Sequence, residues 1–485
     1  MKSFLQQSVI YGLGQVAIQL VGFLIYPILT NDQYFTVAQF GIWNILAPLM
    51  TILTIIYSGG LSTGFFKFFI NNESSQQRYS AFINSVHIVI LGGAFVTLVV
   101  LPILIFTVSP MIQPGFQWEY FIPVMLTAFA NSVIGICLAV YRAQNHAKQF
   151  IIINSARFIL MSGLIILGII VLKRGLWGLL LAYAISSVVV SIFLFVKTYS
   201  SFEKTQVLIG QRTRILKYSA PLIPTQLAGW VLSVSDKFVI GILLGATQVG
   251  LYSAGYQIAL VTNAFFIAPF SLAWGPFMFK EGVQKDGPVK IARLFEIYTV
   301  LGAVFVTPLI LFGVDLIGIL SNNNSYAESY RVIAPVALGY LFFGYYLFYT
   351  TGYNLTDRTK YFPLITGLVG ILNILLNVLL LPQWGYLAAA WVTLVSYFLL
   401  FLIMKLATSR IYALPVKWIK IWVIWILMVC VVWYGSYLIQ KFNVGWPIFV
   451  KGSLVCLVWA MVIIVGGVSS TDISSVFQKK TTDVE

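Results

Sequence analysis

Charged residues are scarce in this chain, and the few that occur are unevenly spread. Only 9% of the 485 residues are Asp, Glu, Lys or Arg, whereas 60% are hydrophobic and the mean hydropathy is +0.93. So little charge excludes an ordinary water-soluble domain. Cysteine and histidine are also rare, with three and two copies, so a disulfide framework or a clustered metal site is not expected.

Several catalytic motifs are missing as well. No G-x-x-x-x-G-K-[ST] sequence is present, which excludes ATP hydrolysis through a P-loop, and neither H-E-x-x-H nor a nucleophile elbow occurs. The gaps that we assign to the outer side of a membrane are short and poorly charged. A membrane-bound glycosyl polymerase or ligase would need an extended outer loop for its catalytic groups. We therefore predict that the chain is not an enzyme.

Long apolar segments are what the chain has in abundance. About 20 apolar residues cross the hydrocarbon core of a bilayer as a helix. We find fourteen such segments and predict an all-α polytopic membrane protein. The predicted spans are 7–30, 40–66, 81–107, 119–141, 150–172, 176–197, 213–244, 248–279, 293–320, 330–354, 361–381, 386–405, 418–438 and 447–467.

The basic residues alternate between the gaps. Of the 29 Lys and Arg residues, 22 lie at the termini or in every second gap, and five lie in the gaps between. Those five are Lys173, Arg174, Arg331, Lys441 and Lys451. Because basic loops stay cytoplasmic, this pattern predicts that both termini lie inside. It also explains the net charge of +15 without nucleic acid, through anionic lipid headgroups.

The chain shows signs of an internal duplication. Residues 18–23 resemble 225–230, and residues 39–43 resemble 248–252, at offsets of 207 and 209. A duplicated unit of six helices has both copies the same way up, with a cleft between two parallel lobes that can rock. The predicted division is an N-terminal lobe at 1–198, a cytoplasmic linker at 199–212, a second lobe at 213–408 and an additional two-helix segment with a tail at 409–485.

Arg157 lies inside an apolar segment, where a charge is costly and should face protein or water. Asn154 lies three residues earlier on the same face. Arg157 could contact an anionic substrate, form a structural ion pair or extend to the inner surface. Lys67 and Arg142 flank inner helix ends, where they could form a basic rim that attracts phosphate or simply determine topology.

The seventh segment carries a polar stripe. Gln226, Ser233 and Lys237 fall within roughly 40° of one another on a helical wheel. Asp236 lies off that stripe. It could be a proton or cation site, or an ion-pair partner for Arg157 or Lys237. An internal charge pair that only fixes the helix in place is the alternative.

These features resemble a known family. Residues 5–12 (Leu-Gln-Gln-Ser-Val-Ile-Tyr-Gly), residues 235–241 (Ser-Asp-Lys-Phe-Val-Ile-Gly) and residues 245–256 (Gly-Ala-Thr-Gln-Val-Gly-Leu-Tyr-Ser-Ala-Gly-Tyr) carry the resemblance, together with the plan of six, six and two helices. They resemble the polysaccharide transporter family of the multidrug/oligosaccharidyl-lipid/polysaccharide exporter superfamily. That family includes O-antigen and exopolysaccharide flippases.

The resemblance implies a MATE-like flippase fold and a flippase for polyprenyl-diphosphate-linked sugar units. The site would be Arg157 and Lys237 on the diphosphate, with Asn154, Gln226 and Ser233 lining the cleft. Asp236 matches the family's acidic position, which implies a coupling or structural role. No cofactor is implied beyond a proton or sodium gradient. The expected partners are the lipid-linked oligosaccharide, the bilayer of a bacterial cytoplasmic membrane, and polymerase and chain-length proteins, without nucleic acid.

One related class differs from this chain, and two alternative functions remain open at this stage. Related flippases of lipid-linked peptidoglycan precursors carry cations in helices 1, 2 and 8, whereas helix 1 here has none, which favours an O-unit or exopolysaccharide substrate. A cation-coupled drug or metabolite antiporter would show acidic residues in the cleft. The sequence predicts Asp236 as the only well-buried acid apart from Asp315, which weighs against that class. A membrane glycosyl polymerase or ligase is the second alternative.

Overall fold

The structure is a computed structural model, and it confirms the predicted all-α fold. It describes residues 25–61, 65, 68–69, 74–111, 116–144, 146–321, 323–356, 358, 361–442 and 448–467, where every regular element is a helix. Eleven helices in these ranges are long and apolar enough to cross a membrane, and two shorter apolar helices lie near the C-terminus. Residues 7–24 of the first predicted span, 7–30, lie outside the described residues.

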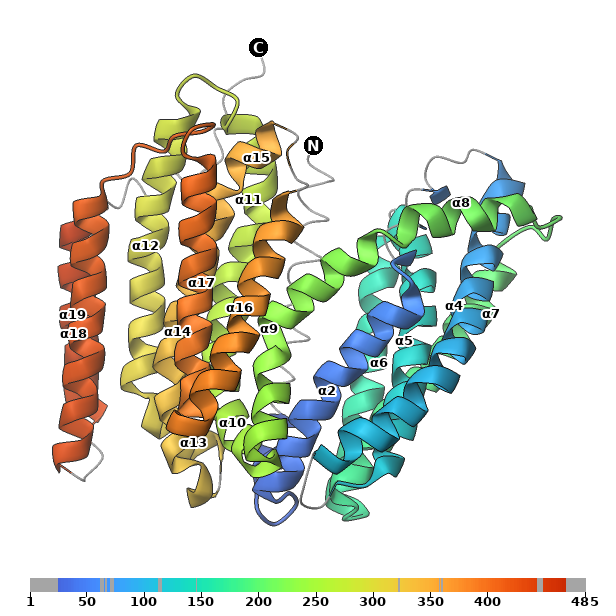
Figure 1. The fold of residues 1–485 in the computed structure, drawn as a ribbon, viewed down its shortest axis with the longest axis horizontal. Coiled ribbons are helices and arrows are strands. Elements are labelled where there is room, and N and C mark those ends of the chain that lie inside the picture. The colour runs from blue at the N-terminus through green and yellow to red at the C-terminus, as the bar shows by residue number, and fades with distance from the viewer. Residues whose placement is uncertain are drawn as a thin grey trace. The chain divides into compact units, whose positions relative to one another are not determined.

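The chain divides into two compact units, which are described separately. Unit 1 takes in the described parts of 1–254, 320–326 and 362–392, and unit 2 takes in 255–319, 327–361 and the described part of 393–485. The fold of each unit is drawn in Figure 1.

Unit 1 is built from helices of eleven to 29 residues. They are α2 (Val37–Ser58), α4 (Ser75–Ile103), α5 (Phe121–Ala143), α6 (Ala147–Ile166), α7 (Gly175–Ser200), α8 (Ile209–Ser219), α9 (Leu222–Leu244), the start of α10 (Ala246–Thr262), α16 (Tyr361–Trp384) and the start of α17 (Leu387–Thr408). Short π-helical stretches extend α4 at Leu104–Val108 and α6 at Leu167–Val171.

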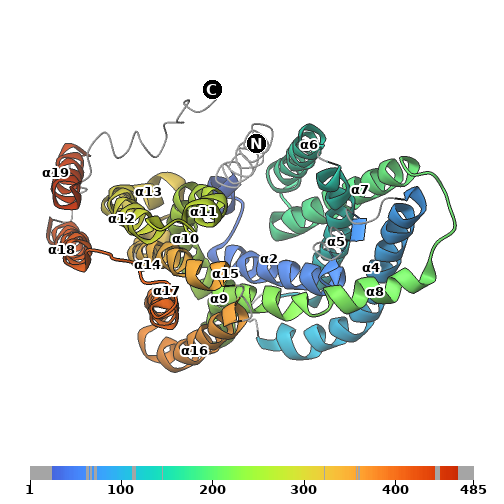
Figure 2. The same ribbon diagram turned by 90° about the horizontal axis from the view of Figure 1, so that it is seen from above.

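Helix α2 has clear sequence signals at both ends. The Thr36 hydroxyl accepts the Gln39 N–H at 3.2 Å and the Gln39 side chain accepts the Thr36 N–H at 3.1 Å, which forms a capping box. Gly59 ends the helix with a φ of 56°, a left-handed conformation that glycine adopts without a Cβ clash. From this start, α2 packs against α5 and α7 on one side and α9 on another, as Figure 2 shows from above.

The predicted span 213–244 is wrong as a single helix. The structure breaks it into α8 and α9, with Ala220 capping the first helix and Pro221 preceding the second. Proline lacks an N–H and fits the beginning of a helix, not its interior. The basic stretch 209–219, part of it predicted as linker and part as membrane span, is therefore a short helix of its own.

The N-terminal halves of α2 and α10 cross at a pair of glycines. A Cβ added to Gly41 would overlap the Ala246 carbonyl oxygen and lie 3.0 Å from Gly250 N. A Cβ added to Gly250 would overlap the Val37 oxygen and lie 3.3 Å from Gly41 N. Both pairs, 37 with 246 and 41 with 250, are separated by the offset of 209 seen in the sequence. The contact is thus reciprocal, because position 41 contacts 246 and position 250 contacts 37. Two copies of a duplicated unit related by a two-fold axis would form a contact of this kind.

Unit 2 is arranged around α12. Its helices are the rest of α10, α11 (Ala268–Glu281), α12 (Gly287–Leu311), α13 (Gly313–Leu320), α14 (Tyr330–Tyr349), α15 (Thr351–Leu355), the rest of α17, α18 (Trp418–Phe442) and α19 (Ile448–Gly466). The predicted span 293–320 is interrupted at Phe312, which caps α12 and separates it from α13. Helix α12 packs against α14, α18 and α19.

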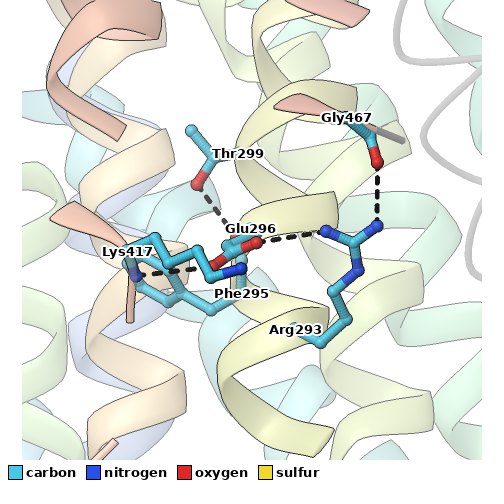
Figure 3. Close-up of polar contacts among 6 residues, drawn as sticks. All are labelled: Arg293, Phe295, Glu296, Thr299, Lys417 and Gly467. Carbon is cyan, nitrogen blue, oxygen red and sulfur yellow. Dashed lines mark hydrogen bonds and ion pairs between the residues drawn. The ribbon is translucent and has the colours of Figure 1, made fainter. Parts of the chain in front are cut away.

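A group of polar contacts ties α12 to both ends of the C-terminal helix pair (Figure 3). Glu296 is 4% exposed and accepts Arg293 Nη1 at 3.2 Å and the backbone N–H of Lys417, just before α18, at 3.3 Å. Arg293 Nη2 donates to the carbonyl of Gly467, just after α19, at 2.9 Å. Midway along α19, Trp459 Nε1 donates to the Val304 carbonyl at 2.9 Å. The helix pair is thus an integral part of unit 2.

Lys451 corrects the charge assignment made from sequence. The alternation placed it in an outer gap, but it lies in the first turns of α19, 4% exposed, and forms an ion pair with Asp315 of α13. Glu296 is a second correction, because the sequence predicted Asp236 as the only well-buried acid apart from Asp315. The charge count grouped Lys451 with the outer gaps although the predicted span 447–467 contains it, because the count considers only the side of the membrane and not burial.

Candidate functional site

Unit 1 contains a buried polar cluster where α9 meets three other helices. Its members come from α2, α9, α10 and α16, and each is less than 7% exposed. The unit 1 polar cluster comprises Asn44, Ser235, Asp236, Lys237, Tyr252, Asn373 and Asn377.

Three consecutive residues of α9 supply the centre of this cluster. Successive side chains on an α-helix are about 100° apart, so Ser235, Asp236 and Lys237 point in three directions. Each contacts a different neighbouring helix. The motif that carries the family resemblance is therefore the point at which α9 is linked to α16, α10 and α2.

Asp236 is held by two donors. One carboxylate oxygen accepts the backbone N–H of Lys237 at 2.8 Å, and the other accepts the phenolic hydroxyl of Tyr252 from α10. Asp236 is 4% exposed. A carboxylate at this depth requires such hydrogen bonds, because burial of an unsolvated charge is costly.

Lys237 reaches toward α2. Its ammonium donates to Asn44 Oδ1 at 3.1 Å, and the Asn44 amide donates in turn to the carbonyl of Phe40 at 2.9 Å. Trp230, two turns earlier on α9, donates to the carbonyl of Pro48 on α2 at 3.0 Å. The cation is therefore positioned at a packed interface between α9 and α2.

The third direction leads to α16. Ser235 donates to Asn373 Oδ1 at 3.4 Å, and Asn377 Nδ2 donates to the same oxygen at 3.1 Å. Asn377 Oδ1 is buried and has no hydrogen-bond partner in the described part of the chain. The carboxylate, hydroxyl and amide oxygens gathered here are the ligand types that hard cations prefer. Among the described residues, no group of three or more His, Cys, Asp or Glu could hold a metal.

Arg157 lies in α6, away from this cluster. Its Nη2 donates to Asn131 Oδ1 of α5 at 2.5 Å, and no ion pair to Arg157 is present among the described residues. Asn154 does not contact it, because the Asn154 amide donates to the Phe150 carbonyl of its own helix at 2.8 Å. Of the alternatives that the sequence left open for Asp236, an ion pair with Arg157 is not formed within the described residues, where Asp236 accepts from the Lys237 N–H and Tyr252.

Helix α2 lies between the two cations. Next to Asn44, Trp43 packs its ring on Tyr183 of α7 at a centroid distance of 4.8 Å. Lys237 contacts α2 directly through Asn44, and Arg157 contacts α5, which packs against α2. Each cation has an amide oxygen as hydrogen-bond acceptor.

The other predicted site residues are dispersed. The Ser233 hydroxyl donates to the Gly229 and Trp230 carbonyls of its own helix, and Gln226 is half-buried near the start of α9. Arg142 is exposed in the last turn of α5. Lys67 lies outside the described residues.

The sequence interpretation missed the hydrogen-bond partners. The acceptors Asn44 and Asn131 were not singled out, although an amide inside an apolar span is itself a costly group that needs a partner, and neither was Tyr252, which donates to Asp236. Asn373 and Asn377, in the predicted span 361–381, were not among the predicted site residues either. A search of the apolar spans for amide side chains that could accept from each buried cation would have included Asn131 and Asn44.

The arrangement favours binding of anions and small cations more than catalysis. Two cations are embedded in unit 1, where electrostatic attraction to an anion is far stronger than in water. No hydroxyl or thiol nucleophile is hydrogen-bonded to a histidine base within the described contacts, since neither His87 nor His146 forms a side-chain hydrogen bond there.

Comparisons with known proteins agree on the class of molecule. Residues 4–281 match the model of a family described as polysaccharide biosynthesis protein. A curated relative is an uncharacterized membrane protein, MJ1375, of Methanocaldococcus jannaschii, 24% identical over 400 residues, which cover 77% of this chain and 90% of the relative.

Solved structures share the fold at low identity. Lipid II flippase MurJ in an inward closed conformation superposes with a TM-score of 0.75 at 12% identity, covering 97% of this chain and 100% of the other. An inward-facing multidrug resistance MATE family transporter of the MOP superfamily gives 0.63 at 14% identity, covering 82% and 98%. The predicted MATE-like fold is confirmed.

Proposed function

Because this chain belongs to the polysaccharide biosynthesis protein family, we propose that it is a flippase for polyprenyl-diphosphate-linked oligosaccharides. It would carry these repeat units across a bacterial cytoplasmic membrane for O-antigen, exopolysaccharide or capsule synthesis. The multi-pass helical fold and its likeness to the lipid II flippase support a membrane carrier.

The embedded cations are the observation that carries this proposal. Arg157 lies in an apolar span and its described partner is a neutral amide, so its charge is available to an anion. A guanidinium binds phosphate oxygens through a fork of N–H donors, which suits a diphosphate. Lys237 would add a second charge from α9, with Asn154, Gln226 and Ser233 contributing polar lining and Lys67 and Arg142 a basic rim.

Movement would follow the duplicated plan. Rocking of the two predicted lobes would expose the bound diphosphate and sugar to each side in turn, while the polyprenyl tail stays in lipid. Asp236 would couple this movement to a proton or sodium gradient, because it joins α9 to α10 through Tyr252 and lies one residue from a substrate cation. The polymerase and chain-length proteins would act on the delivered units.

A cation-coupled antiporter is the second candidate. The observation in its favour is Glu296, a buried acid in unit 2 that the sequence prediction overlooked. Against it, Glu296 is already engaged by Arg293 and by the backbone N–H of Lys417. Its contacts assign it to the docking of the C-terminal helices and leave the flippase as the better-supported function.

The test is the fate of lipid-linked repeat units in a strain that lacks this protein. We expect repeat units to accumulate on the cytoplasmic face, and wild type to restore surface polymer. Arg157→Ala and Lys237→Ala should fail to restore it although they are expressed. Arg410→Ala, which removes an exposed arginine outside the site, serves as the matched control and should complement fully.

Two results would overturn the proposal. If repeat units still reach the outer face without this protein but are not polymerised, the missing step is enzymatic and not transport. If the strain makes normal polymer but loses tolerance to a drug or metabolite, the antiporter is correct.

A further inference from the structure

Helix α8 is firmly attached to the end of α4. The Leu208 N–H donates to Ser80 Oγ at 2.8 Å, Asn84 Nδ2 donates to the Leu208 carbonyl at 3.0 Å, and Gln211 donates to the Gln77 carbonyl at 3.3 Å. Ile215 is fully buried in the apolar core formed with α4, α5 and α7. One face of this eleven-residue helix is therefore committed to unit 1.

The opposite face is basic and free. Ile215 and Ser219 are buried on one side of the helical wheel, whereas Arg214 and Lys217 lie on the other side and are exposed. Leu216, 37% exposed, borders this face, whereas Tyr218 lies nearer the attached side and packs its ring on Phe68 at a centroid distance of 6.0 Å. Two exposed cations beside an exposed apolar side chain suit a helix that lies in a membrane interface.

The position of α8 determines which molecules its basic face can contact. The helix leads through Ala220 and Pro221 directly into the span α9, and it packs on the first turns of the span α4. In Figure 1 it lies across the ends of α4 and α7, at a large angle to both. Because α4 and α9 are both membrane spans, α8 lies at the depth where these spans leave the hydrocarbon core. The charge alternation predicts this end to be cytoplasmic, which is the leaflet rich in anionic lipid.

We propose that α8 is an interfacial helix whose Arg214 and Lys217 bind anionic phospholipid headgroups of the inner leaflet. Such a contact would fix the inner end of unit 1 to the bilayer surface, next to the break at Pro221. An acidic protein partner is disfavoured, because the exposed Leu216 beside the cations and the attachment of α8 to the ends of two membrane spans fit the headgroup boundary. The inference does not depend on the transported substrate.

Amide hydrogen exchange of the full-length protein in lipid nanodiscs tests this locally. Peptides covering residues 208–219 should exchange more slowly in discs with phosphatidylglycerol than in discs of phosphatidylcholine alone. The double variant Arg214→Gln/Lys217→Gln should lose this difference. Each removed charge should weaken lipid binding by about fivefold, the equivalent of about 1 kcal/mol, and 0.5 M salt should weaken it in the wild type as well.

Matched variants separate lipid binding from general effects. Lys280→Gln/Lys285→Gln removes two exposed charges from the same predicted side and should keep the lipid-dependent protection. Arg214→Lys/Lys217→Arg keeps the charge and should also keep it. Equal exchange of α8 in the two lipids would overturn the proposal, as would undiminished protection in the charge-removing variant. If Arg214→Gln/Lys217→Gln has a lower unfolding temperature in phosphatidylcholine, its loss of protection could come from instability. The result for Arg214→Lys/Lys217→Arg then decides, because loss of protection in that variant would overturn the proposal.

Discussion

The glycine crossing between α2 and α10 provides the sharpest test of the packing. Gly41→Ala would place a methyl group 2.6 Å from the Ala246 carbonyl carbon, whereas carbon atoms pack best at about 3.5–4.0 Å. The obstacle is backbone, which cannot rotate away as a side chain can. The two helices must therefore separate.

The expected cost follows from comparison with a harmless glycine. Gly135 in α5 has no atom within 4 Å of an added Cβ, so Gly135→Ala should gain up to about 1 kcal/mol from helix propensity. Overpacking usually costs about 1–3 kcal/mol. Gly41→Ala gains the same propensity, so it should be less stable than Gly135→Ala by the overpacking cost alone, about 1–3 kcal/mol.

Unfolding of the purified protein in detergent, followed by temperature and by denaturant, measures this difference. Because Gly41 and Gly250 share one contact, separation caused by the first alanine should make room for the second. Gly41→Ala/Gly250→Ala should then cost less than the sum of the single variants, by about 0.5–3 kcal/mol. Equal stability of Gly41→Ala and Gly135→Ala, or strict additivity, would refute the reasoning.

Three further predictions concern charges in unit 2. Lys451→Met should destabilise the protein by about 1–3 kcal/mol, since it leaves Asp315 without its cation in a half-buried position; an unchanged unfolding temperature would contradict this. Glu296→Ala should leave the N–H before α18 without an acceptor and cost about 1–3 kcal/mol, visible as faster proteolysis at residues 409–417. The Lys290 ammonium, 2.9 Å away, holds the pKa of the Asp286 carboxyl below its ordinary value. Because this pKa is lowered in the folded state, the ion pair stabilises the folded protein at pH values above the unfolded pKa of about 3.9, and this stabilisation is lost as the pH falls through the folded-state pKa. Wild type and Asp286→Asn should therefore differ in unfolding temperature at pH 5–7 and converge as the pH falls below 4.

Hydropathy predicted most of the helices because a bilayer allows few alternatives to a helix. The failures occurred where a local signal competed with apolar continuity. Ala220 and Pro221 separate two helices inside one predicted span, and Phe312 interrupts another in the same way. Charge alternation counted Lys451 with an outer gap although the predicted span 447–467 contains it, because the count does not consider which basic residues are buried by an acidic partner.

The candidate site was predicted in part. Arg157 and Lys237 stood out because charges are rare inside apolar spans. Their acceptors, Asn131 and Asn44, were missed because they come from other helices, at a distance in sequence that no periodicity reveals. Asp236 was recognised as buried, but its pairing with Tyr252 depends on how α9 crosses α10.

The Lys451–Asp315 pair has a consequence for the order in which the protein is made. The two residues are 136 positions apart, so Asp315 is synthesised well before its cation. Until α19 is inserted, the nascent chain carries an uncompensated carboxylate at the end of unit 2. We expect chains truncated after residue 442 to be degraded rapidly in a pulse–chase experiment, and Asp315→Asn to prolong their lifetime. The last helix would then act as a signal of completion, since its arrival neutralises the charge by which an unfinished chain can be recognised.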